Sequence, residues 1–202
     1  MLLVHGSGSG PWAFDGWAES FPGAQVLAVD LQQGLDVAQA SLEDYADSVV
    51  RGAEGLPRPL ALVGWSLGGL VAMVAAQRVR PDALVLLEAS PPREVQGLRD
   101  VEPRRGTFDP AEAGAHPPPG VRYRRESSFA MGQRDRGVSV PTLPAETRTL
   151  VVYGAGLRHD RGPVLAAHFG ADELDEGVAT HWDLVRDEGV RRRVADWLRT
   201  LG

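Results

Sequence analysis

The stretch GWSLGG, residues 64–69, lies between the apolar residues 60–63 and a second apolar run, residues 70–76. A single serine between glycines at such a junction has two interpretations. The segment can be a purely structural strand-to-helix turn. Alternatively, it can be the G-x-S-x-G pattern, in which a strained turn lifts the serine out of a sheet for chemistry. The pattern is short enough to arise by chance, so its sequence context must decide.

Short apolar runs alternate with amphipathic stretches along the rest of the chain. We expect strands at residues 2–4, 25–29, 60–63, 83–87, 149–153 and 171–174. We expect helices at residues 15–21, from Ser41 to the glycines at 52–55, and at 67–80, 127–134 and 190–201. Strands that are apolar throughout and separated by helices indicate a parallel sheet covered on both faces. The sequence therefore predicts an α/β fold with about six mainly parallel strands.

Composition restricts the class of protein. A chain of 202 residues with 43% apolar and 24% charged residues is typical of one globular domain. The net charge of −6 argues against a nucleic-acid partner. The absence of cysteine excludes disulfides, zinc–thiolate sites and cysteine nucleophiles. No apolar run approaches the roughly 18 residues of a transmembrane helix, and the N-terminus lacks the basic region of a signal peptide. We expect a cytoplasmic protein without a membrane segment.

Residues 91–140 interrupt the alternation of strands and helices, and we call them the excursion. The excursion contains a Pro-Pro and a Pro-Pro-Pro sequence, nine Arg and seven Asp or Glu, which give it a net charge of +2. One interpretation is an irregular surface segment of a single domain, residues 1–202. The other is a short cap over the carboxyl ends of the strands, where open α/β sheets bind ligands.

A serine hydroxyl is a weak nucleophile at neutral pH and needs a base, usually histidine, which in turn needs an orienting carboxylate. Ser66 follows one expected strand and opens a helix, so it is the candidate nucleophile. Of the five histidines, His181 lies after the last expected strand, as the chain order Ser, acid, His requires. His5 ends the first strand, where we expect it to hold the following loop. The candidate pair is therefore Ser66 and His181.

The acid has two candidates. Asp160 lies in the loop after the fifth expected strand, and we take it as the expected acid. Glu88 ends the fourth strand and is the alternative acid. Asp175 and Glu176 are too close to His181 along the chain to orient its ring well. The sequence leaves the choice between Asp160 and Glu88 open.

Backbone N–H groups must stabilise the oxyanion that forms when a serine attacks a carbonyl. The expected donors are the N–H groups of Leu67, at the start of the helix, and of Ser7, in HGSGSG (residues 5–10). This glycine-rich loop could instead hold a phosphate, but a Walker loop requires lysine, which the chain lacks. A dinucleotide fingerprint would require a third glycine at Pro11 or Ala13. We therefore expect neither a cofactor nor a metal.

Together these segments resemble the α/β-hydrolase family. The matching stretches are LLVHGSGSGPW (2–12), VLAVD (26–30), SLEDYADSV (41–49), LVGWSLGGLVA (62–72), LVLLEASPP (84–92), LVVYG (150–154) and HWDLV (181–185). The resemblance implies a triad of Ser66, His181 and an acid, and ester hydrolysis through an acyl-enzyme. It does not imply a substrate, and we expect a small-molecule ester. The family usually has two strands before the one that ends in His-Gly, so we expect a minimal sheet of about six strands with residues 25–29 at an edge.

The position of the expected acid, Asp160, is a second departure from the family pattern. The family often places it about three residues after the Tyr-Gly of VVYG, which is Leu157 here, so Asp160 assumes a short insertion. The stretch GWSLGGLVA (64–72) is also similar to carboxylesterases that remove a methyl ester from pimeloyl-carrier protein, and the arginines of the excursion would permit an acidic carrier protein as a partner. The leading hypothesis is a serine carboxylesterase. The alternatives are a thioesterase or acyltransferase with the same triad, and a non-catalytic binding protein on a hydrolase scaffold.

Overall fold

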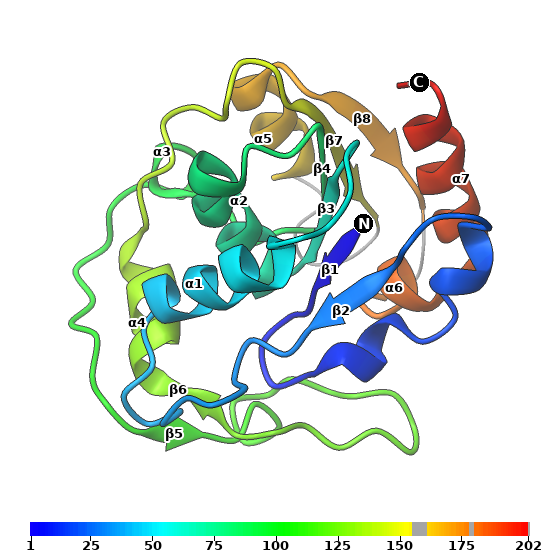
Figure 1. Ribbon diagram of the computed structural model, residues 1–202. Coiled ribbons are helices and arrows are strands. Elements are labelled where there is room, and N and C mark those ends of the chain that lie inside the picture. The colour runs from blue at the N-terminus through cyan, green and yellow to red at the C-terminus, as the bar shows by residue number, and fades with distance from the viewer. Residues whose placement is uncertain (155–160, 178–179, 202) are drawn as a thin grey trace.

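Six parallel strands form the central sheet, in the order β2-β1-β3-β4-β7-β8 (Figure 1). The computed structural model describes residues 1–154, 161–177 and 180–201. The strands are β1 (Leu2–Val4), β2 (Leu27–Val29), β3 (Ala61–Trp65), β4 (Ala83–Leu87), β7 (Arg148–Tyr153) and β8 (Asp172–Asp175). The α/β fold expected from the sequence is confirmed, and β2 lies at the edge where residues 25–29 were expected.

Alternation along the strands divides the core into two layers. In β4, Leu84 and Leu86 face one cluster of buried side chains, whereas Val85 and Leu87 face the other. The first cluster is covered by α1 (Leu42–Ala53), α2 (Leu67–Val79) and α5 (Gly162–Phe169). The second is covered by the 3₁₀ helix η1 (Pro11–Phe14), α6 (Asp183–Arg186) and α7 (Glu188–Arg199), as Figure 1 shows. Because both faces are covered, the central strands are apolar throughout.

The helix α1 begins at the capping box that the sequence predicts. The Ser41 hydroxyl accepts a hydrogen bond from the Asp44 N–H, and the Asp44 carboxylate accepts one from the Ser41 N–H. This reciprocal pair satisfies two N–H groups that the first turn of a helix leaves without partners. Among the described residues, no helix is both long and apolar enough to cross a membrane.

The helix predicted over residues 15–21 is wrong. In its place η1 is followed by a second 3₁₀ helix, η2 (Ala18–Ser20). Gly16 between them has φ +85°, which no α-helix accommodates. Trp17 is fully buried between Phe14 and Phe21, and its indole N–H donates to the Val185 carbonyl at 2.8 Å. The segment is thus fixed by tertiary anchoring of Trp17 and not by helical periodicity.

The excursion contains four short elements. These are α3 (Arg93–Gln96), the antiparallel pair β5 (Thr107–Phe108) and β6 (Glu126–Ser127), and α4 (Ser128–Arg136). The helix expected at residues 127–134 is confirmed as α4, with the Ser127 hydroxyl as its cap. The Gln133 side chain accepts a hydrogen bond from the Leu42 N–H at 2.9 Å, which ties α4 to the start of α1. The helix α4 therefore packs on the α1 side of the sheet, whereas Val121 and Tyr123 of the excursion pack against the other cluster.

Candidate active site

Ser66 forms a strained turn between β3 and α2. Its backbone has φ 57° and ψ −122°, a combination that residues with a side chain rarely adopt. The Ser66 N–H donates to the Leu87 carbonyl at 3.1 Å, and the Ser66 carbonyl accepts from the Ser90 N–H at 2.8 Å. The end of β4 and the residues after it thus hold the turn in place. A strained serine held in this way is the geometry that the G-x-S-x-G interpretation requires.

The glycines around Ser66 are required by close packing. A Cβ atom on Gly64 would lie 2.6 Å from the Gly68 carbonyl oxygen. One on Gly68 would lie 2.2 Å from the Val4 carbonyl oxygen, and one on Gly69 would lie 2.3 Å from the Ala89 Cβ. These separations are shorter than any side chain tolerates, so α2 starts against β1 and β4 only because the three residues are glycines.

Gly68→Ala is expected to destabilise the protein by about 2 kcal/mol or more, because the new methyl group meets backbone carbonyls that cannot move without shifting β1. Chemical denaturation monitored by circular dichroism measures the loss. The matched control is Gly52→Ala in α1, where the new Cβ meets only the ends of the Leu2 and Val29 side chains, at 3.3 and 3.4 Å. Because alanine has the higher helix propensity, we expect Gly52→Ala to lie within about 1 kcal/mol of wild type. Equal stability of the two variants would contradict the packing interpretation.

His181 contacts Glu88 directly. The Nδ1 atom of His181 forms a short hydrogen bond with Glu88 Oε2. Glu88 follows β4 immediately, has φ 41°, and is only 4% exposed, whereas the His181 side chain is 32% exposed. The Glu88 N–H donates to the Val152 carbonyl at 2.7 Å, which fixes the residue between β4 and β7. A buried carboxylate on Nδ1 leaves Nε2 as the nitrogen that can accept a proton.

Aromatic residues hold the segment that carries His181. The Trp65 ring lies 4.9 Å from the His181 ring, centroid to centroid, and the Trp65 indole N–H donates to the His181 carbonyl at 3.1 Å. Trp182 packs against Trp65 at 4.5 Å and stacks on Trp12 at 5.7 Å. Its indole N–H also donates to the Tyr123 hydroxyl at 3.1 Å. Trp65 directly precedes Ser66, so the same residue links the serine turn to the histidine.

The loop after β1, residues 5–10, approaches the serine turn. We call it the β1 loop. A Cβ atom on Gly6 would lie 2.9 Å from Trp65 Cε3 and 3.0 Å from Ser66 Cβ, so the loop can approach Trp65 and Ser66 this closely only with glycine at residue 6. No hydrogen bond from the Ser7 N–H to another of the described residues is found. The Leu67 N–H belongs to the first turn of α2, where N–H groups have no acceptor within the helix. Both predicted oxyanion donors thus belong to segments that meet at Ser66.

His5 orders the β1 loop, as expected from the sequence. It is 1% exposed; its Nε2 accepts from the Leu31 N–H at 3.1 Å, and its Nδ1 lies 2.9 Å from the Gly6 carbonyl oxygen. Because Nε2 accepts, Nδ1 must be the donor to Gly6. The Gly6 oxygen also accepts from the Ser9 hydroxyl at 2.7 Å and the Ser9 N–H at 3.3 Å. In a planar peptide the C=O and the following N–H point in opposite directions, so these three bonds also orient the Ser7 N–H.

All these groups lie at the carboxyl ends of parallel strands: the β1 loop after β1, Ser66 after β3 and Glu88 after β4.

Asp160, the acid expected from the sequence, lies outside the described residues. Glu88 was the alternative, and a sequence signal supported it: one acidic residue directly follows five apolar strand residues. Trp65 was not predicted as a site residue, because a tryptophan at a strand end has no signature that separates anchoring from core packing.

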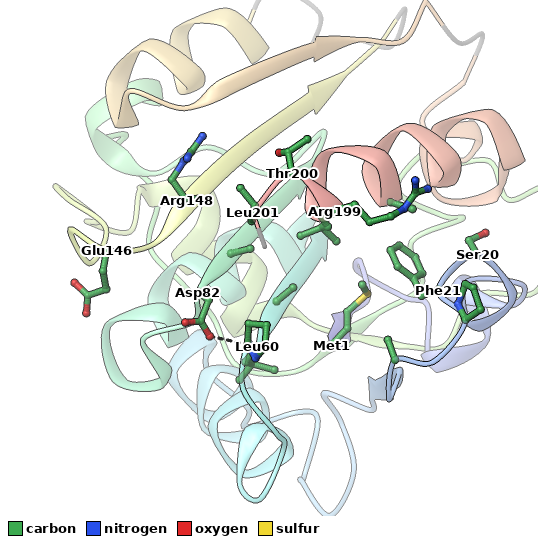
Figure 2. Close-up of a pocket in the computed structure, with 17 residues that line it drawn as sticks. Met1, Ser20, Phe21, Leu60, Asp82, Glu146, Arg148, Arg199, Thr200 and Leu201 are labelled. Carbon is green, nitrogen blue, oxygen red and sulfur yellow. Dashed lines mark hydrogen bonds between the residues drawn. The ribbon is translucent and has the colours of Figure 1, made fainter.

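A cavity of about 670 Å³ lies at the opposite ends of the strands from these groups (Figure 2). Met1, Leu60 and Asp82 in its wall precede β1, β3 and β4, so the cavity is at the amino ends of the strands. None of Ser66, Glu88 and His181 lines it. Within residues 1–154, 161–177 and 180–201, no group of three or more His, Asp or Glu side chains is placed to hold a metal ion.

The model of the alpha/beta hydrolase family matches residues 1–200. Solved structures with the same fold include polyneuridine aldehyde esterase, at 15% identity and TM-score 0.64, with 98% of each chain covered. Tomato methylketone synthase I complexed with 2-tridecanone is 17% identical with TM-score 0.68, over 100% of this chain and 98% of that one. The RedJ thioesterase from the prodiginine biosynthetic pathway in Streptomyces coelicolor is 19% identical with TM-score 0.66, over 100% and 84%. No curated protein matches the sequence.

The chain therefore belongs to the α/β-hydrolase family. The family match over nearly the whole chain confirms the resemblance found in the sequence, and family membership supports a hydrolase activity. The solved structures, at these identities, show the fold alone.

Proposed function

We propose that the protein is a serine hydrolase that cleaves a carboxylic ester of a small acyl substrate through an acyl-enzyme. The observation that carries the proposal is the hydrogen bond of His181 Nδ1 with the buried Glu88. Trp65, which directly precedes Ser66, anchors His181 through its backbone carbonyl. A structural turn or a binding surface does not require a strained serine, a carboxylate-bound histidine and a glycine-rich loop together at the carboxyl ends of the strands. In this proposal Glu88 is the acid, and Asp160 stays a prediction from the sequence.

In the first half of the reaction, His181 Nε2 takes the proton of the Ser66 hydroxyl as Ser66 Oγ bonds to the ester carbonyl carbon. The electron pair of the C=O bond moves to its oxygen, which accepts hydrogen bonds from the Ser7 and Leu67 N–H groups. Glu88 holds the ring with its proton on Nδ1 and stabilises the imidazolium. The C–O bond to the alcohol then breaks, and the imidazolium gives its proton to the leaving oxygen.

The second half repeats these steps with water. His181 Nε2 removes a proton from the water, the hydroxide oxygen bonds to the acyl carbon, and the oxyanion again faces Ser7 and Leu67. Collapse of this intermediate breaks the bond to Ser66 Oγ, and the proton on His181 returns to the serine. The products are the carboxylic acid and the free enzyme. We also propose that residues 91–140 form a cap that shapes the acyl site within a single domain. A cytoplasmic location stays a prediction from the sequence.

The test is covalent labelling with a fluorophosphonate, followed by hydrolysis of p-nitrophenyl esters of increasing acyl length. The proposal expects one label on the Ser66 peptide and turnover with a preference for one chain length. Turnover without a label on Ser66 would contradict it. Neither a label nor turnover, in a folded protein, would favour a binding protein on a hydrolase scaffold.

A thioesterase with the same triad is the second candidate. It is favoured by the net charge of +2 of the excursion, which suits an acidic carrier protein, and by the match to the RedJ thioesterase. The seven Asp or Glu of the excursion, and ion pairs such as Arg124 with Asp30, argue for the alternative that the nine arginines are neutralised. Exposed charges are screened beyond about 8 Å at physiological salt, so docking of an acidic carrier should weaken as salt rises. The measurement compares kcat/KM for an acyl-carrier thioester and for a small ester at low and high salt. A steep fall for the carrier substrate alone supports the thioesterase. An equal, shallow dependence for both supports the small-molecule esterase.

A further inference from the structure

A buried carboxylate of the excursion bonds to the β1 loop. Glu126, at the start of β6, is 2% exposed, and its Oε2 atom accepts a hydrogen bond from the Gly8 N–H at 2.9 Å. Its Oε1 atom accepts from the Tyr45 hydroxyl at 2.5 Å and from the Ser127 N–H at 2.8 Å. The Gln32 amide is a further donor, at 3.4 Å from Oε1. One side chain of the excursion thus joins α1, the residues after β2 and the loop beside Ser66.

The buried Glu126 carboxylate is not part of an ion pair among the described residues. Among the described residues no arginine or histidine forms a salt bridge with Glu126. A buried carboxylate is costly unless hydrogen bonds replace its hydration, and here four donors do so. Burial and the adjacent Glu126 raise the pKa of the Tyr45 phenol above its ordinary value, so Tyr45 stays a donor at neutral pH. Hydrogen bonds on Oε1 thus replace the hydration of this carboxylate, while Oε2 accepts from Gly8.

Gly8 is held on both of its backbone groups by the excursion. Its N–H donates to Glu126, and its carbonyl accepts from the Arg124 N–H at 2.7 Å. Gly8 has φ +66°, and a Cβ atom there would lie 2.5 Å from Pro110 Cγ, so the loop closes tightly under the excursion. The Gly8 N–H belongs to the peptide unit between Ser7 and Gly8. Because that unit is planar, Glu126 fixes its orientation.

Ser7 thus lies between two fixed peptide planes. The plane before it is set by the three hydrogen bonds on the Gly6 oxygen, and the plane after it by Glu126. Only the φ and ψ angles of Ser7 connect the two planes. Loss of the bond to Glu126 frees the second plane, so the Ser7 N–H is then held from one side only.

We propose that Glu126 is a positioning residue for the reaction and that it aims the Ser7 N–H at the oxyanion by fixing Gly8. The inference rests on the proposed serine hydrolase function. It assigns part of the excursion to the catalytic step and not only to substrate choice. Glu126 acts through the β1 loop and does not touch the reacting atoms.

The experiment compares Glu126→Gln with Tyr45→Phe, each assayed for hydrolysis of a p-nitrophenyl ester. Gln keeps the shape of Glu, but its amide supplies one acceptor oxygen. Because three donors surround Oε1, the Gln oxygen is expected there, which leaves the NH₂ group facing the Gly8 N–H. Tyr45→Phe removes one donor from the same network and leaves the bond from Gly8 to Oε2. The two variants therefore separate loss of the Gly8 bond from general weakening of the network.

We expect Glu126→Gln to lower kcat by about 10- to 100-fold with KM nearly unchanged, since a misplaced oxyanion donor acts on the transition state. Affinity for an alkyl boronic acid, whose tetrahedral adduct places an oxygen where the oxyanion forms, should fall by the same factor as kcat/KM. Tyr45→Phe should unfold at lower denaturant concentration but keep its kcat. Glu126→Asp, which retains the charge but withdraws it from Gly8, should behave as Glu126→Gln does.

A merely structural role predicts another pattern. In that case Glu126→Gln and Tyr45→Phe would keep the same kcat per folded molecule, boronate affinity would not change, and the inference would be overturned. Ser66→Ala, measured beside them, keeps the two proposals distinguishable. If Ser66→Ala is inactive but Glu126→Gln has wild-type kcat, only the positioning role fails. If Ser66→Ala stays active, the proposed function itself fails.

Discussion

Ser66→Ala is expected to lose on the order of 10⁶ in kcat for ester hydrolysis while folding as the wild type does, because removing the nucleophile of a triad leaves only binding and oxyanion stabilisation. Steady-state hydrolysis of a p-nitrophenyl ester measures the loss, and fluorophosphonate labelling should disappear with it. The backbone at residue 66 has φ 57° with either side chain, so little change in stability is expected. Retention of even a tenth of wild-type turnover by the folded variant would refute the nucleophile assignment.

Two further sets of variants test whether the loss is specific to Ser66 and its pairing with His181. Ser48→Ala removes the hydroxyl of a buried serine on α1, which bonds to the Asp44 carbonyl at 3.2 Å and the Leu31 carbonyl at 3.3 Å, and should remain active. His181→Ala should be nearly as inactive as Ser66→Ala. The double variant should be little worse than either single one, because the two residues act as a unit.

Glu88→Gln is expected to lower kcat by about 10⁴-fold, the cost of replacing the carboxylate that holds a triad histidine in the correct tautomer. The physical reason is the contact of Glu88 with His181 Nδ1, which an amide can reproduce only with its NH₂ group turned away. KM should change little. Circular dichroism and denaturation must show that the variant folds, since the position is buried.

Asp160→Asn is the matched control, because it makes the same acid-to-amide change at the acid expected from the sequence. We expect it to keep most of the wild-type kcat. The reverse result, with the large loss at Asp160 and a small one at Glu88, would make Asp160 the acid. Large losses in both variants would show that the histidine depends on both carboxylates.

Local patterns predicted the elements that local physics controls. The apolar runs predicted the buried strands of the central sheet, and Ser41 with Asp44 predicted the start of α1, because strand burial and capping depend on neighbouring residues. The strand β8 (Asp-Glu-Leu-Asp) is mostly exposed and was expected at nearly the same residues, 171–174. The helix predicted near Trp17 failed because the positive φ of Gly16 and the burial of Trp17 depend on partners far along the chain. The contact of α4 with α1 was beyond prediction for the same reason, since 91 residues separate Leu42 from Gln133.

The sequence by itself determined the α/β class and the place of the turn at Ser66, because apolar periodicity and the G-x-S-x-G spacing involve only residues close along the chain. Only the tertiary structure decided that Glu88 contacts His181, 93 residues away, and that Glu126 bonds to Gly8, 118 residues away. A hydrogen bond requires donor and acceptor within about 3 Å, and sequence patterns do not specify positions that finely between distant segments. The packing of β4, the β1 loop and the excursion sets those positions, and with them the proposed acid and the proposed support of the oxyanion donors.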